Sequence, residues 1–492
     1  MARTPLAQRV EEAYAGVAES RTTRRELLKR TSAAGVALAG ASTMGRFAAA
    51  AYGAGQPSIA IVGAGLAGLT CGYRLKQAGI NAQIYEGSGR VGGRCYSIRD
   101  FSPLIAEHGG ELIDQGHTQI RQLAQELGLD LDNLLQAQPS NTEDFFWVNG
   151  GKYEYAQLVD DLNGIYQKMH KDVSAASYPT LWNSYTQRGL ELDHMSIIDW
   201  LDETIPNGGS QSNLGRVLDL AYNIEYGAEC SIQSSLNLLY LLGYRGQGQF
   251  QVFGASNEKY HVRGGNDQIP ARLANGLSGQ ISLNTALASI KLNAGGSYTL
   301  TFNHDVGTQT VIADHVVLAL PFSLLRSVNY SKAGFEPLKV TAIKQLPMGT
   351  NSKLHVEFND RFWYGAGNNG NTYADTGFQN TWEVSRAQGG GKGILVDYTG
   401  GKIGASFGSG TPEQRAAQFI GQLAPLFPDI AVPKHSDSTN PRFAISGMEY
   451  ARQGNCHFCG EHTSQDFQGY LNGGVETGER VAGDILADLK HA

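Results

Sequence analysis

The sequence predicts an α/β fold, and three stretches of its 492 residues support that prediction. Residues 58–86 contain a short apolar strand, a glycine-rich turn, a helix with one apolar face and a second strand. Residues 313–321 (ADHVVLALP) form a nearly continuous apolar run, typical of a strand covered on both faces of a parallel sheet. Residues 352–400 contain strands such as KLHVEF and ILVDYTGG, which we expect to alternate between buried and exposed positions. We therefore expect a parallel-sheet domain and a separate α+β domain.

The first stretch predicts a Rossmann-like turn that binds a dinucleotide. In IVGAGLAGL, Gly63 permits a tight turn, Gly65 lets a pyrophosphate approach the backbone, and Gly68 lets the helix pack against the strand. The amino end of the following helix offers free N–H groups to phosphate oxygens. Glu86 ends the second strand, where a carboxylate accepts hydrogen bonds from ribose hydroxyls and repels a 2′-phosphate.

A second glycine-rich loop follows at once, with arginines between its glycines (EGSGRVGGR, residues 86–94). Arg94 can give paired donors to the same pyrophosphate from the other side. A nicotinamide cofactor must leave after each turnover, so a double clamp suits it poorly. The pair of loops predicts a dinucleotide that stays bound.

Composition excludes several classes of partner. Lys and Arg total 39 and Asp and Glu total 46, so the formal charge of −7 gives no reason to expect nucleic acid. No apolar run of about 20 residues could span a membrane. The sequence does not decide whether the chain forms a homo-oligomer.

Five cysteines, an odd number, do not indicate a disulfide framework. Cys456 and Cys459 form a C-x-x-C pattern with His462 three residues on, but a zinc site would need a fourth ligand that the pattern lacks. We expect no metal.

Residues 1–50 resemble a twin-arginine signal peptide. Arg24 and Arg25 precede a weakly hydrophobic stretch from Thr31 to Met44, and four alanines at 48–51 suit a cleavage site. This pattern predicts export to the periplasm or the exterior of a bacterium. A disordered basic tail ahead of a short helix is the alternative.

From residue 59 to about residue 487 the chain resembles the flavin amine oxidase family, which includes monoamine oxidases, polyamine oxidases and many L-amino acid oxidases. The motifs that carry the resemblance are IVGAGLAGL…YEGSGRVGGR, EHGGELID, RGGNDQIPARLA, LNTALASI and CGEHTSQDFQGYLNGG. The resemblance implies FAD as the cofactor. It implies that Gly110 and Glu111 run beneath the isoalloxazine, that Leu287 touches the adenine, and that Gly460 and Glu461 belong to a C-terminal signature with Glu461 on the ribityl chain.

The same resemblance implies two catalytic residues. Lys353, in LPMGTNSKLHVEF, matches the family lysine that holds a water against flavin N5, and Tyr470, in FQGYLNGG, matches one wall of an aromatic cage that faces the flavin. A dehydrated aromatic slot favours the neutral amine, the form that can lose hydride. The alternatives are a surface lysine on an alternating strand and a tyrosine packed in the core.

The chain departs from the family pattern in one place. The aromatic-rich stretch that precedes the C-terminal signature is absent, since residues 441–448 read PRFAISGM. No cysteine occupies the position that tethers flavin in monoamine oxidases, so we expect noncovalent FAD. The substrate slot is then open or rebuilt from Trp363, Trp382 or Tyr398. No arginine that would hold a substrate carboxylate can be named.

These observations predict an FAD-dependent oxidase that deaminates an L-amino acid or a primary amine, with dioxygen as acceptor and an imine and hydrogen peroxide as products. L-Amino acids are narrowly preferred, and a monoamine or polyamine substrate is the alternative. A protein that binds FAD without activity is a further alternative because of the missing stretch. A desaturase or porphyrinogen-type oxidase, and a carrier like the prenyl-protein dissociation inhibitors, fit the motifs less well.

The expected layout divides the chain into six segments. An FAD-binding domain is assembled from residues 59–116, 259–330 and 455–492 after the signal peptide (1–50). A largely helical insertion (117–258) and a substrate domain (331–454) separate these pieces. The substrate domain contains a helix that begins near Pro412, a residue suited to a first helical turn.

Overall fold

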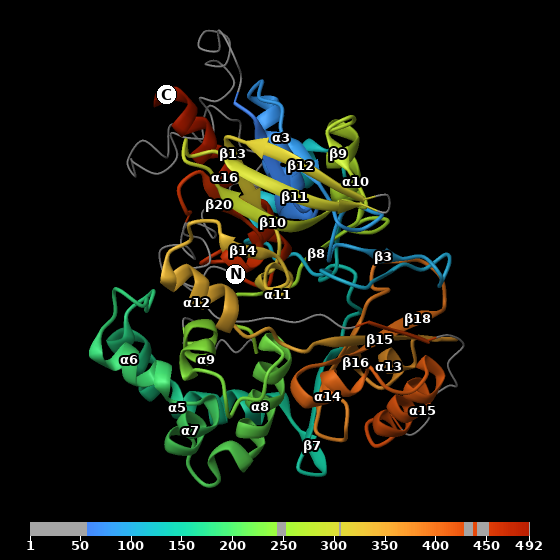
Figure 1. Cartoon of the computed structure of the whole chain (residues 1–492). Helices are drawn as coiled ribbons and strands as arrows, with labels where there is room; N and C mark the ends of the chain where they lie inside the picture. Colours follow the sequence, from blue (N-terminus) through green and yellow to red (C-terminus); the bar gives the residue numbers. More distant parts are fainter. Residues whose placement is uncertain (1–56, 244–251, 305–306, 428–435, 440–451, 492) are drawn as a thin grey trace, which may run out of the picture.

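The computed structural model describes residues 57–243, 252–304, 307–427, 436–439 and 452–491. The predicted signal peptide and the stretch 441–448 lie outside these residues, so neither prediction is tested. None of the described helices is long and apolar enough to cross a bilayer. Figure 1 shows two parts: one holds the parallel sheet, and the other holds a group of helices beside a second large sheet.

The first part is built on a five-stranded parallel sheet whose strands come from distant stretches of the chain. Its order is β20 (Cys456–Phe458), β13 (His315–Leu318), β1 (Ile59–Val62), β2 (Gln83–Tyr85) and β9 (Ile281–Ser282). All residues of β1 and β13 are buried, because both faces of the sheet are covered. The α/β fold class and the discontinuous assembly of this domain are confirmed.

Helices cover one face of this sheet and a second sheet covers the other. Ile61 and Val317 point into a cluster with α3 (Leu66–Gln77), α4 (Thr118–Glu126), α10 (Gln268–Gly276) and α16 (Leu471–His491). Val62 and Leu318 point the opposite way, as neighbouring strand residues do. They pack against a four-stranded sheet of β12 (Gly307–Ala313), β11 (Tyr298–His304), β10 (Ala286–Leu292) and β14 (Asn329–Lys332).

The second part contains a seven-stranded mixed sheet. Its order is β19 (Ser436–Thr439), β15 (Ser352–Phe358), β18 (Gly393–Thr399), β17 (Asn380–Glu383), β16 (Asn368–Ala374), β6 (Glu143–Val148) and β7 (Gly151–Tyr153). Helix α15 (Pro412–Leu423) packs on one face through Phe419. It begins where the sequence predicts, with Pro412 in its first turn and a capping box between Thr411 and Gln414.

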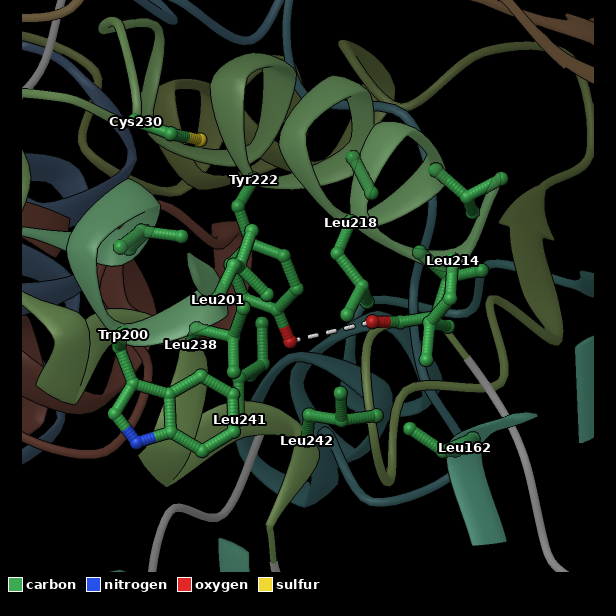
Figure 2. Close-up of a cluster of buried hydrophobic side chains, with 14 of the residues drawn as sticks. Leu162, Trp200, Leu201, Leu214, Leu218, Tyr222, Cys230, Leu238, Leu241 and Leu242 are labelled. Carbon is green, nitrogen blue, oxygen red and sulfur yellow. Dashed lines mark hydrogen bonds between the residues drawn. The ribbon is translucent and has the colours of Figure 1, made fainter. Parts of the chain in front are cut away.

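Five helices form the other half of the second part: α5 (Tyr155–Ala176), α6 (Gln187–His194), α7 (Ile197–Thr204), α8 (Asn213–Tyr226) and α9 (Ser235–Leu242). Figure 2 shows part of their shared core, in which Trp200, Leu218 and Leu238 belong to one hydrophobic cluster. Tyr222 is fully buried there, and its hydroxyl donates to the carbonyl of Val252 at 3.3 Å. This satisfied core holds α8 in place, and α8 carries one wall of the cavity described below.

The expected alternation of β15 between buried and exposed residues is wrong. All seven residues of β15 are buried, including Lys353, His355 and Glu357. Leu354 and Val356 face α15, whereas the polar side chains face the first part of the molecule. A strand between two packed layers has no solvent face, so its polar residues must find partners inside the protein.

The expected segment boundaries shift by some residues. Helix α4 packs on the parallel-sheet domain, and β5 (Leu131–Asn133) pairs with β8 (Tyr260–Val262), so the first segment of that domain extends past residue 116 to about residue 133. Strand β14 and helix α12 (Pro337–Gln345) also stay with this domain, past residue 330. The insertion is not purely helical, because β6 and β7 join the second sheet.

Candidate active site

The glycine turn after β1 leaves one side of the backbone open. A side chain at Gly63, whose φ is +106°, would lie 2.6 Å from the carbonyl oxygen of Ala319, and one at Gly68 would lie 2.0 Å from that of Gly63. Packing within the protein therefore requires both glycines. A side chain at Gly65 would meet no protein atom within 4 Å. Helix α3 begins beside this open backbone, and its N-cap residue Gly65 has no side chain to cap it, so the site suits an anionic ligand.

Glu86 joins the two glycine-rich loops. Its carboxylate accepts hydrogen bonds from the N–H of Ala64 at 2.7 Å and from the N–H of Ser88 at 2.9 Å. The loops also contact directly, because the N–H of Gly92 donates to the carbonyl of Ala64 at 2.9 Å. The structure thus brings together the two loops that the sequence predicts as a double clamp.

The third segment of the domain closes the other side of the cradle. Arg94 lies 2.5 Å from a carboxylate oxygen of Glu461, which follows β20. Gly460 has a φ of +136°, and a side chain there would lie 2.5 Å from the ring of His462. The sequence predicts contacts from Arg94 to the pyrophosphate and from Glu461 to the ribityl chain. The structure shows the two residues paired with each other at the same place.

Leu287 lies at the far end of the cradle, on β10. The residues just before Leu287 lie against the end of β2, because the N–H of Thr285 donates to the carbonyl of Glu86 at 2.7 Å. The side chain of Leu287 is partly buried against the cluster between the two sheets. It is therefore close in the fold to Glu86, on the side where the sequence places the adenine.

These observations test whether the residues fit FAD, and they do. An open backbone and an uncapped helix end suit the pyrophosphate, and a carboxylate at the end of β2 suits a ribose. Arg94 and Glu461 stand on the opposite side and supply charged donors and acceptors. Gly63, Gly65, Gly68, Glu86 and Arg94 would hold the dinucleotide, with Glu461 beside them.

Lys353 is buried against residues 107–111, the segment that the sequence predicts to run beneath the flavin. Its ammonium group donates to the carboxylate of Glu111 at 2.8 Å, to the carbonyl of Gly109 at 2.9 Å and to that of Glu107 at 3.2 Å. The alternative of a surface lysine is therefore excluded. The other oxygen of Glu111 accepts a hydrogen bond from the indole of Trp382 at 2.9 Å. All three ammonium donors face protein oxygens.

The segment at Gly110 lies against the start of α16, where the two parts of the molecule meet. A side chain at Gly110 would lie 2.5 Å from Leu471, the first residue of α16. The next residue back, Tyr470, donates its hydroxyl to Glu225 of α8 at 2.7 Å, and its ring centroid lies 5.1 Å from that of His117. Tyr470 is therefore not simply packed in the core, because its hydroxyl reaches a carboxylate across the junction of the two parts.

A cavity of about 560 Å³ lies at this junction, and both predicted catalytic residues, Lys353 and Tyr470, line it. Trp382 and Tyr398 line it as well, with ring centroids 5.1 Å apart at 64°. Trp363 does not, because it is fully buried in the core under α15. Of the three aromatic residues that the sequence offers as a rebuilt slot, two are therefore in position.

The cavity is acidic. Its walls carry four glutamates, and its only cations among the described residues are two lysines. One of these lysines, Lys353, is already paired with Glu111. The glutamates are Glu111, Glu225, Glu229 and Glu258, and the second lysine is Lys402. Among its described lining residues there is no arginine.

Glu258 stands in the wall shared with a second cavity of about 420 Å³. Three donors hold its loop on the carboxylate of Asp114: the hydroxyl of Ser256 at 2.7 Å and the N–H groups of Asn257 and Glu258 at 3.0 and 2.7 Å. Loss of hydration in the cavity wall, together with the nearby carboxylates of Asp114 and Glu225, raises the pKa of Glu258 to about 8.

Sequence reasoning missed Glu225 and Glu258. Neither lies in a motif, and they come from α8 and from the loop before β8. The spacing of acidic residues along the chain gives no sign that they meet Glu111 in one cavity.

The C-x-x-C pattern forms no site. Cys456 and Cys459 are buried in two different hydrophobic clusters on opposite faces of the parallel sheet. Burial raises the pKa of the Cys459 thiol to about 12, so it stays protonated and inert at neutral pH.

Comparisons with known proteins agree with this geometry. The model of the family described as flavin-containing amine oxidoreductases matches residues 66–486. Polyamine oxidase 7 of Oryza sativa subsp. japonica is 26% identical over 87% of this chain and 94% of its own. A probable flavin-containing monoamine oxidase A of Dictyostelium discoideum is 24% identical over 88% of this chain and 98% of its own.

Solved structures share the fold. A putrescine oxidase bound to putrescine superposes with a TM-score of 0.75 at 21% identity, over 88% of this chain and 99% of its own. Cyclohexylamine oxidase from Brevibacterium oxydans gives a TM-score of 0.75 at 20% identity, over 89% of this chain and 100% of its own.

A cradle that fits FAD therefore opens onto an acidic, aromatic cavity, in a chain that the family model matches over most of its length. This protein belongs to the flavin-containing amine oxidoreductase family, as an FAD-dependent amine oxidase that acts on a CH–NH₂ group.

Proposed function

We propose that this enzyme oxidises an amine that carries a second positive charge, such as a diamine or polyamine, rather than an L-amino acid. The observation that carries the proposal is the composition of the cavity wall: four glutamates against two lysines, with no arginine among the described lining residues. A substrate carboxylate would meet the carboxylates of Glu225 and Glu229, joined by that of Glu258 above about pH 8, with no guanidinium among the described lining residues to hold it. The amine alternative from the sequence is therefore preferred to the amino acid.

The relatives support this preference. Their printed names are those of monoamine, polyamine, putrescine and cyclohexylamine oxidases, all of which refer to amines without a carboxylate. The identities of 20–26% leave the substrate of this chain open, so the argument depends on its own residues.

The positions of the residues around the cavity indicate a role for each of them in amine oxidation. Bound FAD supplies the hydride acceptor, and dioxygen is the expected final oxidant. Trp382, Tyr398 and Tyr470 offer apolar ring surfaces near the cradle, which exclude water from the reacting carbon. Glu225 and Glu258 lie in the same cavity and can bind a distal ammonium group. The Lys353–Glu111 pair fixes the segment between the cradle and the cavity.

The cofactor is proposed to be held without a covalent bond. All five cysteines lie within the described residues, and none of them lines either cavity. Denaturation with acid should therefore release all of the yellow colour into the supernatant. Flavin that stays with the precipitate would contradict this part of the proposal.

The test compares substrates of matched length. The holoenzyme is assayed for hydrogen peroxide with α,ω-diamines, with monoalkylamines of equal chain length and with L-amino acids. We expect kcat/KM for the best diamine to exceed that of the matched monoamine by about tenfold, the size of one charge-assisted contact. An L-amino acid as the best substrate would overturn the proposal. Absence of flavin bleaching by every amine would instead support the inactive alternative.

The variants Glu225→Gln and Glu258→Gln locate the distal site. Each keeps the shape of the side chain and removes the carboxyl group, which in Glu258 is charged only above about pH 8. We expect KM to rise for the diamine and to stay unchanged for the monoamine. Glu203→Gln, an exposed change on α7 outside both cavities, serves as the matched control. Equal effects on both substrates would show that the glutamates do not bind a second charge.

A further inference from the structure

Two histidines lie on the parallel sheet away from the edge that carries the glycine turn. His315 is the first residue of β13, and His457 is the middle residue of β20. The strands pair in parallel with Val317 opposite His457, so His315, two residues before Val317, points to the same face as His457. That face packs against α16, and Figure 1 shows α16, β13 and β20 close to one another.

Three ring nitrogens of these histidines lack hydrogen-bond partners among the described residues. His457 is completely buried, and neither of its ring nitrogens has a partner among the described residues. Nδ1 of His315 is also buried without a partner, and the two ring centroids lie 5.8 Å apart. A buried polar atom without a partner costs about 1–3 kcal/mol, so three such nitrogens together call for an explanation.

A carboxylate completes the group. Asp488, near the end of α16, brings an oxygen so close that one ligand atom from each of the three residues lies within 4.8 Å of the others. Its side chain is 30% exposed, which gives an ion a path from solvent. Two imidazoles and one carboxylate are ligands that suit Zn²⁺, with a water in the fourth position.

We propose that His315, His457 and Asp488 bind a divalent transition-metal ion, with Zn²⁺ the expected occupant. The ion would connect β13 and β20 to the last helix. Because α16 also packs on α3, the helix at the glycine turn, such a link would stabilise the domain that holds the cofactor. The site is separate from the amine cavity, since none of the three residues lines it.

A neighbouring cation, Arg452, provides a direct test of the proposed site. Arg452 donates to the carboxylate of Asp488 at 2.6 Å, and its side chain is 44% exposed. Its guanidinium competes with an ion for the same carboxylate and repels the ion. The carboxylate of Asp314 lies close to His315. Its negative charge attracts a cation at this site, whereas the positive charge of Arg452 repels one. Removal of the Arg452 charge should therefore strengthen metal binding.

The experiment uses the full-length holoenzyme without a purification tag, stripped with a chelator and then titrated with Zn²⁺ by calorimetry. We expect one equivalent to bind and to raise the thermal midpoint. Asp488→Asn should weaken binding by at least about tenfold, and Arg452→Gln should strengthen it several-fold. His194→Gln, an exposed histidine on α6, is the control and should bind like the unchanged protein.

A spectroscopic readout identifies the ligands. Cu²⁺ placed in the same site should show nitrogen couplings from two imidazoles in its paramagnetic resonance spectrum, and oxidised flavin gives no signal there. Substitution of the fully buried His457 risks misfolding, so the decision depends on the half-exposed Asp488 and Arg452. FAD content of each variant confirms that it is folded. No stoichiometric Zn²⁺ binding by the unchanged protein, or equal affinity in Asp488→Asn, would overturn the proposal.

Discussion

The cofactor cradle and the amine cavity meet at Gly110 and Glu111, but they are made of different groups. The cradle consists mainly of backbone: glycines, an uncapped helix end and two loops hydrogen-bonded to each other. The cavity consists of side chains: aromatic rings and four glutamates. The first is sensitive to added atoms and the second to changes of charge and pH, so different substitutions should disrupt them.

The largest effect is expected from a methyl group inside the cradle. Gly68→Ala places a carbon 2.0 Å from the carbonyl oxygen of Gly63, so the turn must shift. We expect a loss of about 3 kcal/mol of unfolding free energy, measured by chemical denaturation of the holoenzyme.

Gly65→Ala is its matched control, because the added carbon meets no protein atom. The apoprotein should keep its stability while the FAD content falls. Equal destabilisation of the apoprotein by both variants would show that the open side of the turn is not reserved for a ligand.

Next in size is the removal of the buried ammonium group between the two regions. Lys353→Met leaves the carboxylate of Glu111 buried without its cation, which should cost about 3 kcal/mol of unfolding free energy. The double variant Lys353→Met with Glu111→Gln removes both charges and should recover much of that loss.

Turnover distinguishes a structural from a catalytic lysine. If Lys353 acts in catalysis, kcat in the double variant stays low although stability returns. Recovery of both quantities together would make Lys353 only a positioning residue.

The next prediction concerns the pH dependence of stability, through a buried carboxyl group in the seven-stranded sheet. Asp397 on β18 is buried, one of its oxygens lacks a partner among the described residues, and burial raises its pKa to about 8. The folded state holds this proton more tightly than the unfolded state, so the stability that it contributes is full below about pH 4 and is lost as the pH rises to about 8.

Asp397→Asn stays neutral throughout. The variant should match the unchanged protein near pH 4 and exceed its unfolding free energy at pH 8.5, where the unchanged protein must bury a charge. Parallel stability curves across this range would contradict the assigned proton.

The smallest effect tests the charge of the cavity itself. Because the pKa of Glu258 is raised to about 8, its carboxyl is neutral below that pH and becomes an anion above it. A quaternary ammonium inhibitor keeps its charge at every pH, so its inhibition constant should fall about tenfold between pH 6.5 and 8.5. In Glu258→Gln the profile should be flat, and a pH dependence that survives in this variant would assign the effect to another group.

Local sequence determined the cradle. Gly63, Gly65, Gly68 and Glu86 lie within 30 residues of one another, and the geometry that requires them is a property of one strand, one turn and one helix. The burial of β13 was also readable, because an unbroken apolar run has only one stable environment.

Tertiary structure alone decided which charged residues meet in the cavity and at the cradle. Glu111, Glu225 and Glu258 come from separate elements, and only the packing of the helices of Figure 2 against the second sheet brings them into one cavity. The pairing of Arg94 with Glu461 likewise joins two segments that lie far apart in the sequence. Short-range patterns follow from backbone geometry, whereas the meeting of distant charges depends on how whole layers pack, and hydrophobic burial sets that packing without regard to the charges it brings together.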